Sequence, residues 1–157
     1  PEPLDFGEEG KHGYFYGTLD HSKLVVKFIP SATREFISVG IKCDGNMDSN
    51  DIKKAVRLAC EEGKRKNIYR VVFTGLINPY LSLAAAVDDV KDEFYCLCYQ
   101  DRTAPDYDIK KLYQDNKDNI VGKFIVSLME DAVNDPVAYK ALIAGLDALL
   151  TQEGGAK

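Results

Sequence analysis

Two short runs near the start of the chain are rich in aromatic and β-branched residues. They are GYFYGTL at 13–19 and KLVVKFI at 23–29, and Asp20-His21-Ser22 is the turn between them. Aromatic and β-branched side chains favour strands. Pro30 cannot donate to a strand ladder, so it is expected to end the second run. The pattern predicts a β-hairpin over residues 12–30.

The next predicted elements alternate between strand and helix. Residues 34–43 alternate in polarity, as a half-buried strand does. Residues 49–62 then repeat apolar side chains at the spacing of a helix that lies on a sheet. The inward faces are Ile37, Val39, Ile41 and Cys43 on the strand, and Ile52, Ala55, Val56, Ala59 and Cys60 on the helix.

The second half of this unit follows the same order. Residues 67–76 predict a central strand, 81–91 a short helix, 93–100 a third strand and 101–107 a loop. The short helix is expected to turn Leu81, Leu83, Ala84, Val87 and Val90 inward. The order β-α-β-α-β is typical of a two-layer α/β unit.

From Asp108 onward no strand pattern remains. Residues 119–132 carry a wide apolar stripe, and Asn134-Asp135-Pro136 is a typical signal for a helix to begin. The last helix is expected to stop before Gly154. The predicted fold class is therefore α/β (α+β) in three segments: a terminal hairpin at 1–31, an α/β capping unit at 32–107 and a C-terminal helical hairpin at 108–157.

Composition narrows the protein class. The chain has 157 residues, 45% of them hydrophobic and 29% charged, with a formal net charge of −5. These values fit an ordinary folded domain and exclude a disordered chain. No apolar run reaches the length of a membrane span, and no signal peptide opens the sequence. Because the sequence begins at Pro1 without Met, we expect a processed chain or a piece of a longer one.

The four cysteines allow two interpretations. Cys96 and Cys98 share one strand face with Phe94, which would suit a metal site or a redox pair. The favoured interpretation is that these two cysteines, like Cys43 and Cys60, are reduced and act as small buried hydrophobic residues. Reduced cysteines predict a cytoplasmic location.

A basic segment stands out on this acidic chain. Lysines and arginines outnumber carboxylates over residues 51–70. Such a patch can contact phosphates, or it can complement the C-terminal end of a helix. No catalytic or phosphate-binding motif occurs, and the acidic pairs at 88–89 and 92–93 are interpreted as a solvated surface. The residues alone predict no catalytic residue and no metal ligand.

Several stretches resemble the C-terminal region of bacterial SbcD-like exonucleases of the calcineurin-type metallophosphoesterase superfamily. The glycine-rich start PEPLDFGEEGKHGYFYG resembles the strand after the family's last metal-binding motif, through Gly7, Gly10, His12, Gly13 and Gly17. The stretch KFIPSATREFISVGI is similar to the step into the capping domain, through Phe28, Pro30, Ala32 and Arg34. NIYRVVFTGLINP resembles the central cap strand, and DNIVGKFIVSLMED and YKALIAGLDALL resemble the closing helices.

The resemblance implies that this chain is a non-catalytic part of a DNA-repair exonuclease. This part would cap the catalytic domain, position DNA and bind a partner protein. The parent's two divalent metal ions, expected to be manganese, would lie in a missing catalytic domain, so this chain alone would not be an enzyme. The expected partners are DNA and an SbcC-like coiled-coil ATPase, without a membrane. The candidate DNA-binding residues are Arg34, Lys64, Arg65, Lys66 and Arg70, and the candidate partner-binding residues are Phe124, Leu128, Leu146 and Leu150.

Two other functions remain open at this point. The chain could be a self-contained protein-interaction module with no nucleic-acid role. It could also be a small enzyme that uses Cys96 and Cys98 or the acidic cluster. Salt-dependent DNA binding would separate the first from the capping hypothesis, and metal analysis with thiol titration would test the second.

Overall fold

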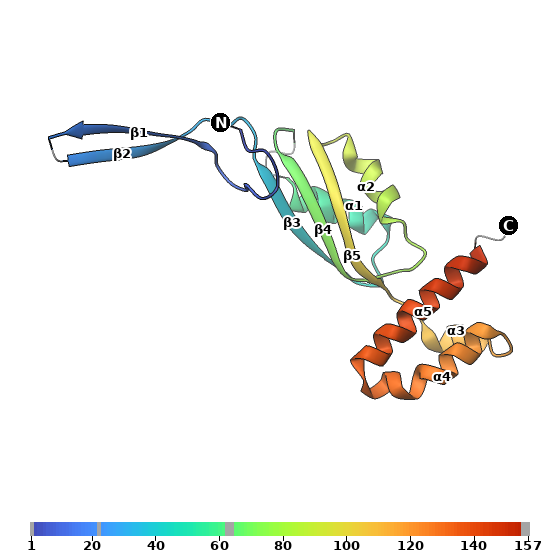
Figure 1. Ribbon diagram of the computed structural model, residues 1–157. Coiled ribbons are helices and arrows are strands. Elements are labelled where there is room, and N and C mark those ends of the chain that lie inside the picture. Colours follow the sequence, from blue (N-terminus) through green and yellow to red (C-terminus); the bar gives the residue numbers. More distant parts are fainter. Residues whose placement is uncertain (1, 22, 62–64, 155–157) are drawn as a thin grey trace. The chain divides into compact units, whose positions relative to one another are not determined.

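The computed structural model describes residues 2–21, 23–61 and 65–154 (Figure 1). It divides into two compact units, Pro1–Ala104 and Pro105–Lys157, which are described separately. The first contains a two-stranded ribbon and a three-stranded sheet with two helices, and the second is helical. This mixed content confirms the predicted α/β (α+β) class.

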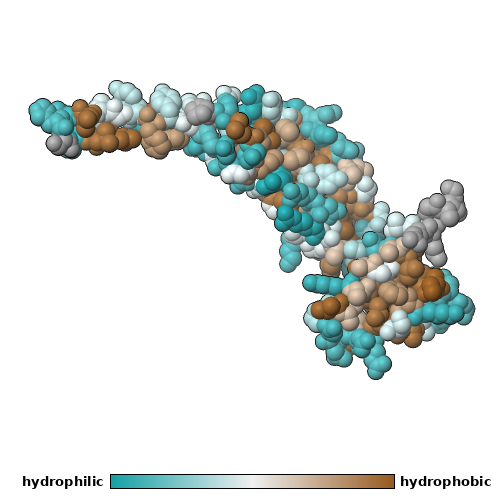
Figure 2. Space-filling view, in the orientation of Figure 1, coloured by the Kyte–Doolittle hydropathy of each residue, from teal (hydrophilic) through white to brown (hydrophobic). Residues whose placement is uncertain are grey.

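The ribbon pairs β1 (Gly13–Asp20) with β2 (Lys23–Pro30) in antiparallel fashion, which confirms the predicted hairpin. Its register places Phe15 opposite Phe28 and Leu19 opposite Leu24 on one face. None of the described strand positions on that face carries a charged side chain, and Phe15, Leu19 and Leu24 are 74%, 72% and 64% exposed. The ribbon therefore presents an apolar face to solvent, visible in part as brown patches in Figure 2.

The sheet has the order β3-β4-β5, with β4 (Ile68–Ile77) in the predicted central place. β3 (Phe36–Cys43) runs parallel to β4 and pairs Phe36 with Ile68 through to Cys43 with Gly75. β5 comprises Cys96–Pro105, so the prediction of a loop over 101–105 was wrong. Pairing along the long central strand extends β5 into polar residues whose own sequence favours a turn.

Two helices, α1 (Ser49–Ala59) and α2 (Leu83–Lys91), lie on one side of the sheet (Figure 1). The core between them and the sheet contains Ile52 and Val56 from α1, Val71 and Phe73 from β4, and Val90 from α2. Asp48 begins α1 with a capping box, since its side chain accepts from the Asp51 N–H while the Asp51 side chain accepts from the Asp48 N–H.

Two details of the predicted helix faces were wrong. Ala59, expected inside, is exposed at the last residue of α1. In α2, Ala84 is exposed and Ala86 is fully buried. The α2 difference follows from the start of the helix: Ser82 caps it by accepting from the Ala85 N–H, so Leu81 precedes the helix and the buried stripe begins at Leu83.

The second unit contains α3 (Ile109–Asp115), α4 (Ile120–Asn134) and α5 (Pro136–Gly154). The two long helices were predicted, whereas α3 was not predicted as a separate element. Val121 and Ile125 of α4 pack against Leu142 and Leu146 of α5 in a small core. Asn119 caps α4 by accepting from the N–H groups of Val121 and Gly122.

Candidate nucleic-acid interface

Within the first unit, the described helices α1 and α2 pack on one face of the sheet and leave its other face without a helix. Because the odd-numbered residues Tyr69, Val71 and Phe73 are buried against the helices, the even-numbered residues of β4 point to the opposite side. The register of β3 with β4 extends this open face to β3, and in β5 the buried Leu97 turns the even-numbered residues to the same side. It consists of Phe36, Ser38, Gly40 and Lys42 from β3, Ile68, Arg70, Val72 and Thr74 from β4, and Cys96, Cys98, Gln100 and Arg102 from β5.

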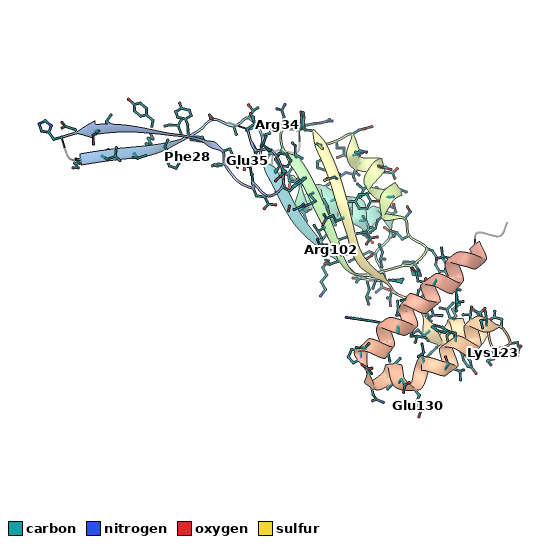
Figure 3. The ribbon with its side chains drawn as sticks, in the orientation of Figure 1. Phe28, Arg34, Glu35, Arg102, Lys123 and Glu130 are labelled. Carbon is teal, nitrogen blue, oxygen red and sulfur yellow. The ribbon has the colours of Figure 1, made fainter. Side chains whose placement is uncertain are left out.

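Charge is segregated on the open face. None of the described strand positions on it holds Asp or Glu, while it carries Lys42, Arg70 and Arg102. Lys42 and Arg102 are exposed, and neither forms an ion pair with any described residue (Arg102 is labelled in Figure 3). Among the residues that the structure describes, the Arg102 guanidinium donates only to the Gln100 side chain, with Nη2 3.0 Å from Oε1. The face is therefore locally cationic on a chain with net charge −5.

One end of the open face is covered by the chain's own N-terminal loop. The Arg70 guanidinium stacks 4.4 Å from the Phe6 ring centroid, and Phe6 meets Phe36 edge to face at 4.9 Å. Arg70 also donates to the Ser38 hydroxyl, with its Nη2 2.8 Å from Oγ. Arg70 therefore anchors this loop, and within the first unit the described residues leave the other end of the face, around Lys42 and Arg102, uncovered.

Arg34 lies just before β3 and contacts Tyr95, the residue immediately before β5. Its guanidinium is 4.2 Å from the Tyr95 ring centroid, and its buried Nε has no hydrogen-bond partner in the described part of the chain. Glu2 accepts from the N–H groups of Thr33 and Arg34, and the Thr33 hydrogen bond is the main cause that lowers the pKa of the Glu2 carboxyl. Arg34 thus ties the N-terminal segment to the sheet.

The other predicted DNA-binding residues are scattered. Arg65 donates to the backbone oxygen of Asp92 at 2.6 Å, just after α2, so it completes a helix end. Lys66 lines a cavity of about 170 Å³ with Lys11, His12 and Glu35. Lys64 lies outside the described residues.

Lys42 and Arg102 were not among the predicted residues. The alternation of β3 could have placed Lys42 on the outer face. Arg102 could not be placed, because its segment was interpreted as a loop. The open face thus contains one predicted residue, Arg70, with two unpredicted cations.

The cysteines divide into two pairs. Cys43 and Cys60 are buried, as predicted, and burial raises the pKa of both thiols, that of Cys60 to about 11. Cys96 and Cys98 are exposed on the open face, so their interpretation as buried hydrophobes was wrong. The reason is the phase of β5: Leu97 points toward the helices, which turns its two neighbours outward.

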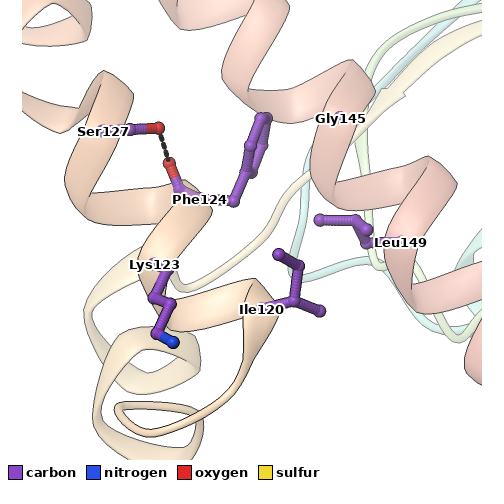
Figure 4. Close-up of a pocket in the computed structure, with 6 residues that line it drawn as sticks. All are labelled: Ile120, Lys123, Phe124, Ser127, Gly145 and Leu149. Carbon is purple, nitrogen blue, oxygen red and sulfur yellow. Dashed lines mark hydrogen bonds between the residues drawn. The ribbon is translucent and has the colours of Figure 1, made fainter.

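The predicted partner-binding residues also divide. Leu146 is fully buried in the helical core and is not available to a partner. Leu128 and Leu150 are half-buried against the same core. Phe124 lines an apolar groove with Ile120 and Leu149, shown in Figure 4, where its ring lies toward Gly145.

No described group of three or more His, Cys, Asp or Glu side chains is arranged to hold a metal ion. No helix in the described part of the chain has the length and apolar character needed to cross a membrane. Comparison with known proteins returned no matching family model, no matching curated protein and no matching solved structure.

Proposed function

We propose that the chain is a non-catalytic capping, DNA-positioning and partner-docking part of a DNA-repair exonuclease of the metallophosphoesterase superfamily. In this proposal residues 1–31 close the catalytic core, 32–107 form the cap and 108–157 form the docking region. Catalysis, with two divalent metal ions, belongs to the parent's catalytic domain, and the location is cytoplasmic. The proposal rests on the resemblance in the sequence and on the open face of the sheet.

The carboxylate-free open face is the observation that carries the DNA role. A chain of net charge −5 repels a polyanion on average, so DNA can bind only where cations are segregated from carboxylates. Lys42 and Arg102 meet that condition, since both are exposed and unpaired among the described residues. Each phosphate contact releases counterions, which makes the binding sensitive to salt.

The ribbon supports membership in a larger fold. An isolated two-stranded hairpin is marginally stable in water, and an exposed apolar face marks a contact surface. The face that contains Phe15, Leu19 and Leu24 is the side on which a further sheet would pack. This supports the proposal that β1 and β2 complete the phosphoesterase core.

The experiment is a salt titration of DNA binding. The double variant Lys42→Ala/Arg102→Ala is compared with a control, Lys54→Ala/Lys140→Ala, which loses the same charge from exposed helix positions. We expect the first variant to reduce the slope of log Kobs against log salt by about two, because each lost phosphate contact reduces it by about one. The control should keep the wild-type slope.

Two outcomes would contradict the DNA role. Equal effects of the two double variants would show that only net charge matters. No DNA binding by the wild-type chain at low salt would leave the protein-interaction module as the better hypothesis.

The apolar groove beside Phe124 favours a docking role for the helical unit. Ile120, at its rim, is 62% exposed, and Val126, also on α4 but outside the groove, is 58% exposed. In a pull-down with the coiled-coil ATPase, Ile120→Asp should abolish capture and Val126→Asp should not. Capture that survives Ile120→Asp would rule out this groove as the docking site.

A further inference from the structure

The open face carries two exposed free thiols, Cys96 and Cys98, at alternate positions of β5. Alternate strand residues point to the same face, and a rise of about 3.3 Å per residue places their Cα atoms about 6.6 Å apart. Rotation about the Cα–Cβ bonds can bring two such thiols toward each other. The Cys98 thiol lies at the sheet surface and donates to the backbone oxygen of Tyr69, with Sγ 3.4 Å from that oxygen.

The number of ligands decides which ion could bind. No described third His, Cys, Asp or Glu joins the two thiols in a group that could hold a metal. Zinc in proteins takes four ligands, and calcium and magnesium take oxygen, so none of these ions fits. Thiolates select soft ions, and Cu(I) is satisfied by two thiolates in a linear arrangement.

The charges around the pair favour the same ion. Two thiolates on a monovalent cation leave one net negative charge, which a cationic surface stabilises. Arg70 and Arg102 lie on the same face.

We propose that Cys96 and Cys98 form a two-coordinate binding site for a soft monovalent metal ion, for which Cu(I) is the probe. On binding, each S–H bond releases its proton to solvent and each sulfur forms one bond to the ion. The oxidation states of copper and sulfur do not change. This site goes beyond the proposed function and does not depend on it.

The experiment is a competition for Cu(I) between the full chain, fully reduced and kept under anaerobic conditions, and the colorimetric chelator bicinchoninate. The wild-type chain should withhold one equivalent of Cu(I). Cys96→Ser and Cys98→Ser should each lose that equivalent, and both are exposed positions where a serine is tolerated. Cys43→Ala removes a buried thiol and should keep it, with circular dichroism to verify its fold.

X-ray absorption of the loaded chain should show two sulfur neighbours around copper. The proposal is overturned if the wild-type chain withholds no Cu(I), or if either serine variant withholds as much as the wild type. Half an equivalent per chain, or three or more sulfur neighbours, would also overturn it, because the ion would then be shared between chains.

Discussion

Gly145 offers a direct test of how the helical unit packs. It lies on α5 where the ring of Phe124 from α4 lies against it, and a Cβ at this position would overlap the Cζ and Cε1 atoms of that ring. On an exposed helix, replacing glycine by alanine stabilises by about 1 kcal/mol. At a packed position, added volume costs about 1–3 kcal/mol. The sign of Gly145→Ala therefore depends on whether the ring can move.

The groove beside the ring limits the cost. The ring borders an open groove of about 480 Å³, with Ile120 and Leu149 on its walls, so it has space into which it can rotate. We therefore expect the overlap alone to lower the free energy of unfolding by about 2 kcal/mol. Set against the gain of about 1 kcal/mol in helix propensity, Gly145→Ala should lower the free energy of unfolding by about 1 kcal/mol.

A double-mutant cycle isolates the overlap. In a Phe124→Ala background the ring is absent, so Gly145→Ala should raise the free energy of unfolding by about 1 kcal/mol. The assay is denaturant unfolding followed by far-UV circular dichroism. Ala144→Gly, at the exposed neighbouring position, should cost about 1 kcal/mol and so measures the propensity on the same helix. Equal stabilisation by Gly145→Ala in both backgrounds would refute this packing.

Two further predictions concern stability elsewhere in the chain. Leu19→Thr/Leu24→Thr on the exposed face of the ribbon should change the free energy of unfolding by less than about 0.5 kcal/mol, whereas Val71→Ala in the core should lower it by about 2 kcal/mol. A loss above about 1 kcal/mol for the leucine variant in denaturant titrations would mean that this face is covered. The Cys60 thiol has a pKa raised to about 11 from 9.0, so its contribution to stability is complete below about pH 9 and is lost between about pH 9 and 11. The stability difference between the wild type and Cys60→Ala should therefore narrow by about 1 kcal/mol by about pH 10, and a constant difference would contradict the raised pKa.

The elements that could be predicted are those whose signals are local. The hairpin follows from two β-rich runs around one turn, and α1 follows from its apolar spacing after the capping residue Asp48. β5 shows the limit of this reasoning. Its second half is polar and was predicted as a loop, yet pairing with the long strand β4 extends it to Pro105. Backbone pairing with a strand that is distant in the sequence cannot be predicted from the local pattern of polar and apolar residues.

The direction in which side chains point was harder to predict than the elements themselves. Phe94, Cys96 and Cys98 were assigned to one face, but β5 begins only at Cys96 and Leu97 is the residue packed inward. In the helical unit, the apolar stripe of α4 is wider than the surface that α5 covers. The structure therefore places Leu146 in the core and leaves Phe124 beside a groove, a difference that hydropathy alone could not reveal.

The candidate interface depends on the local distribution of charge, which the net charge of the whole chain does not show. The net charge of −5 argues against nucleic-acid binding by the whole surface. The basic segment 51–70 is the one place where the sequence itself predicts a cluster of cations. In the structure, Arg65 of that segment completes a helix end, whereas Lys42 and Arg102, 60 residues apart in the sequence, share one sheet face. Placing both residues on one face requires the order of the strands and the true length of β5. A single sequence supplies neither, so lysines and arginines that are isolated in the sequence can form a cationic face that no run of charged residues predicts.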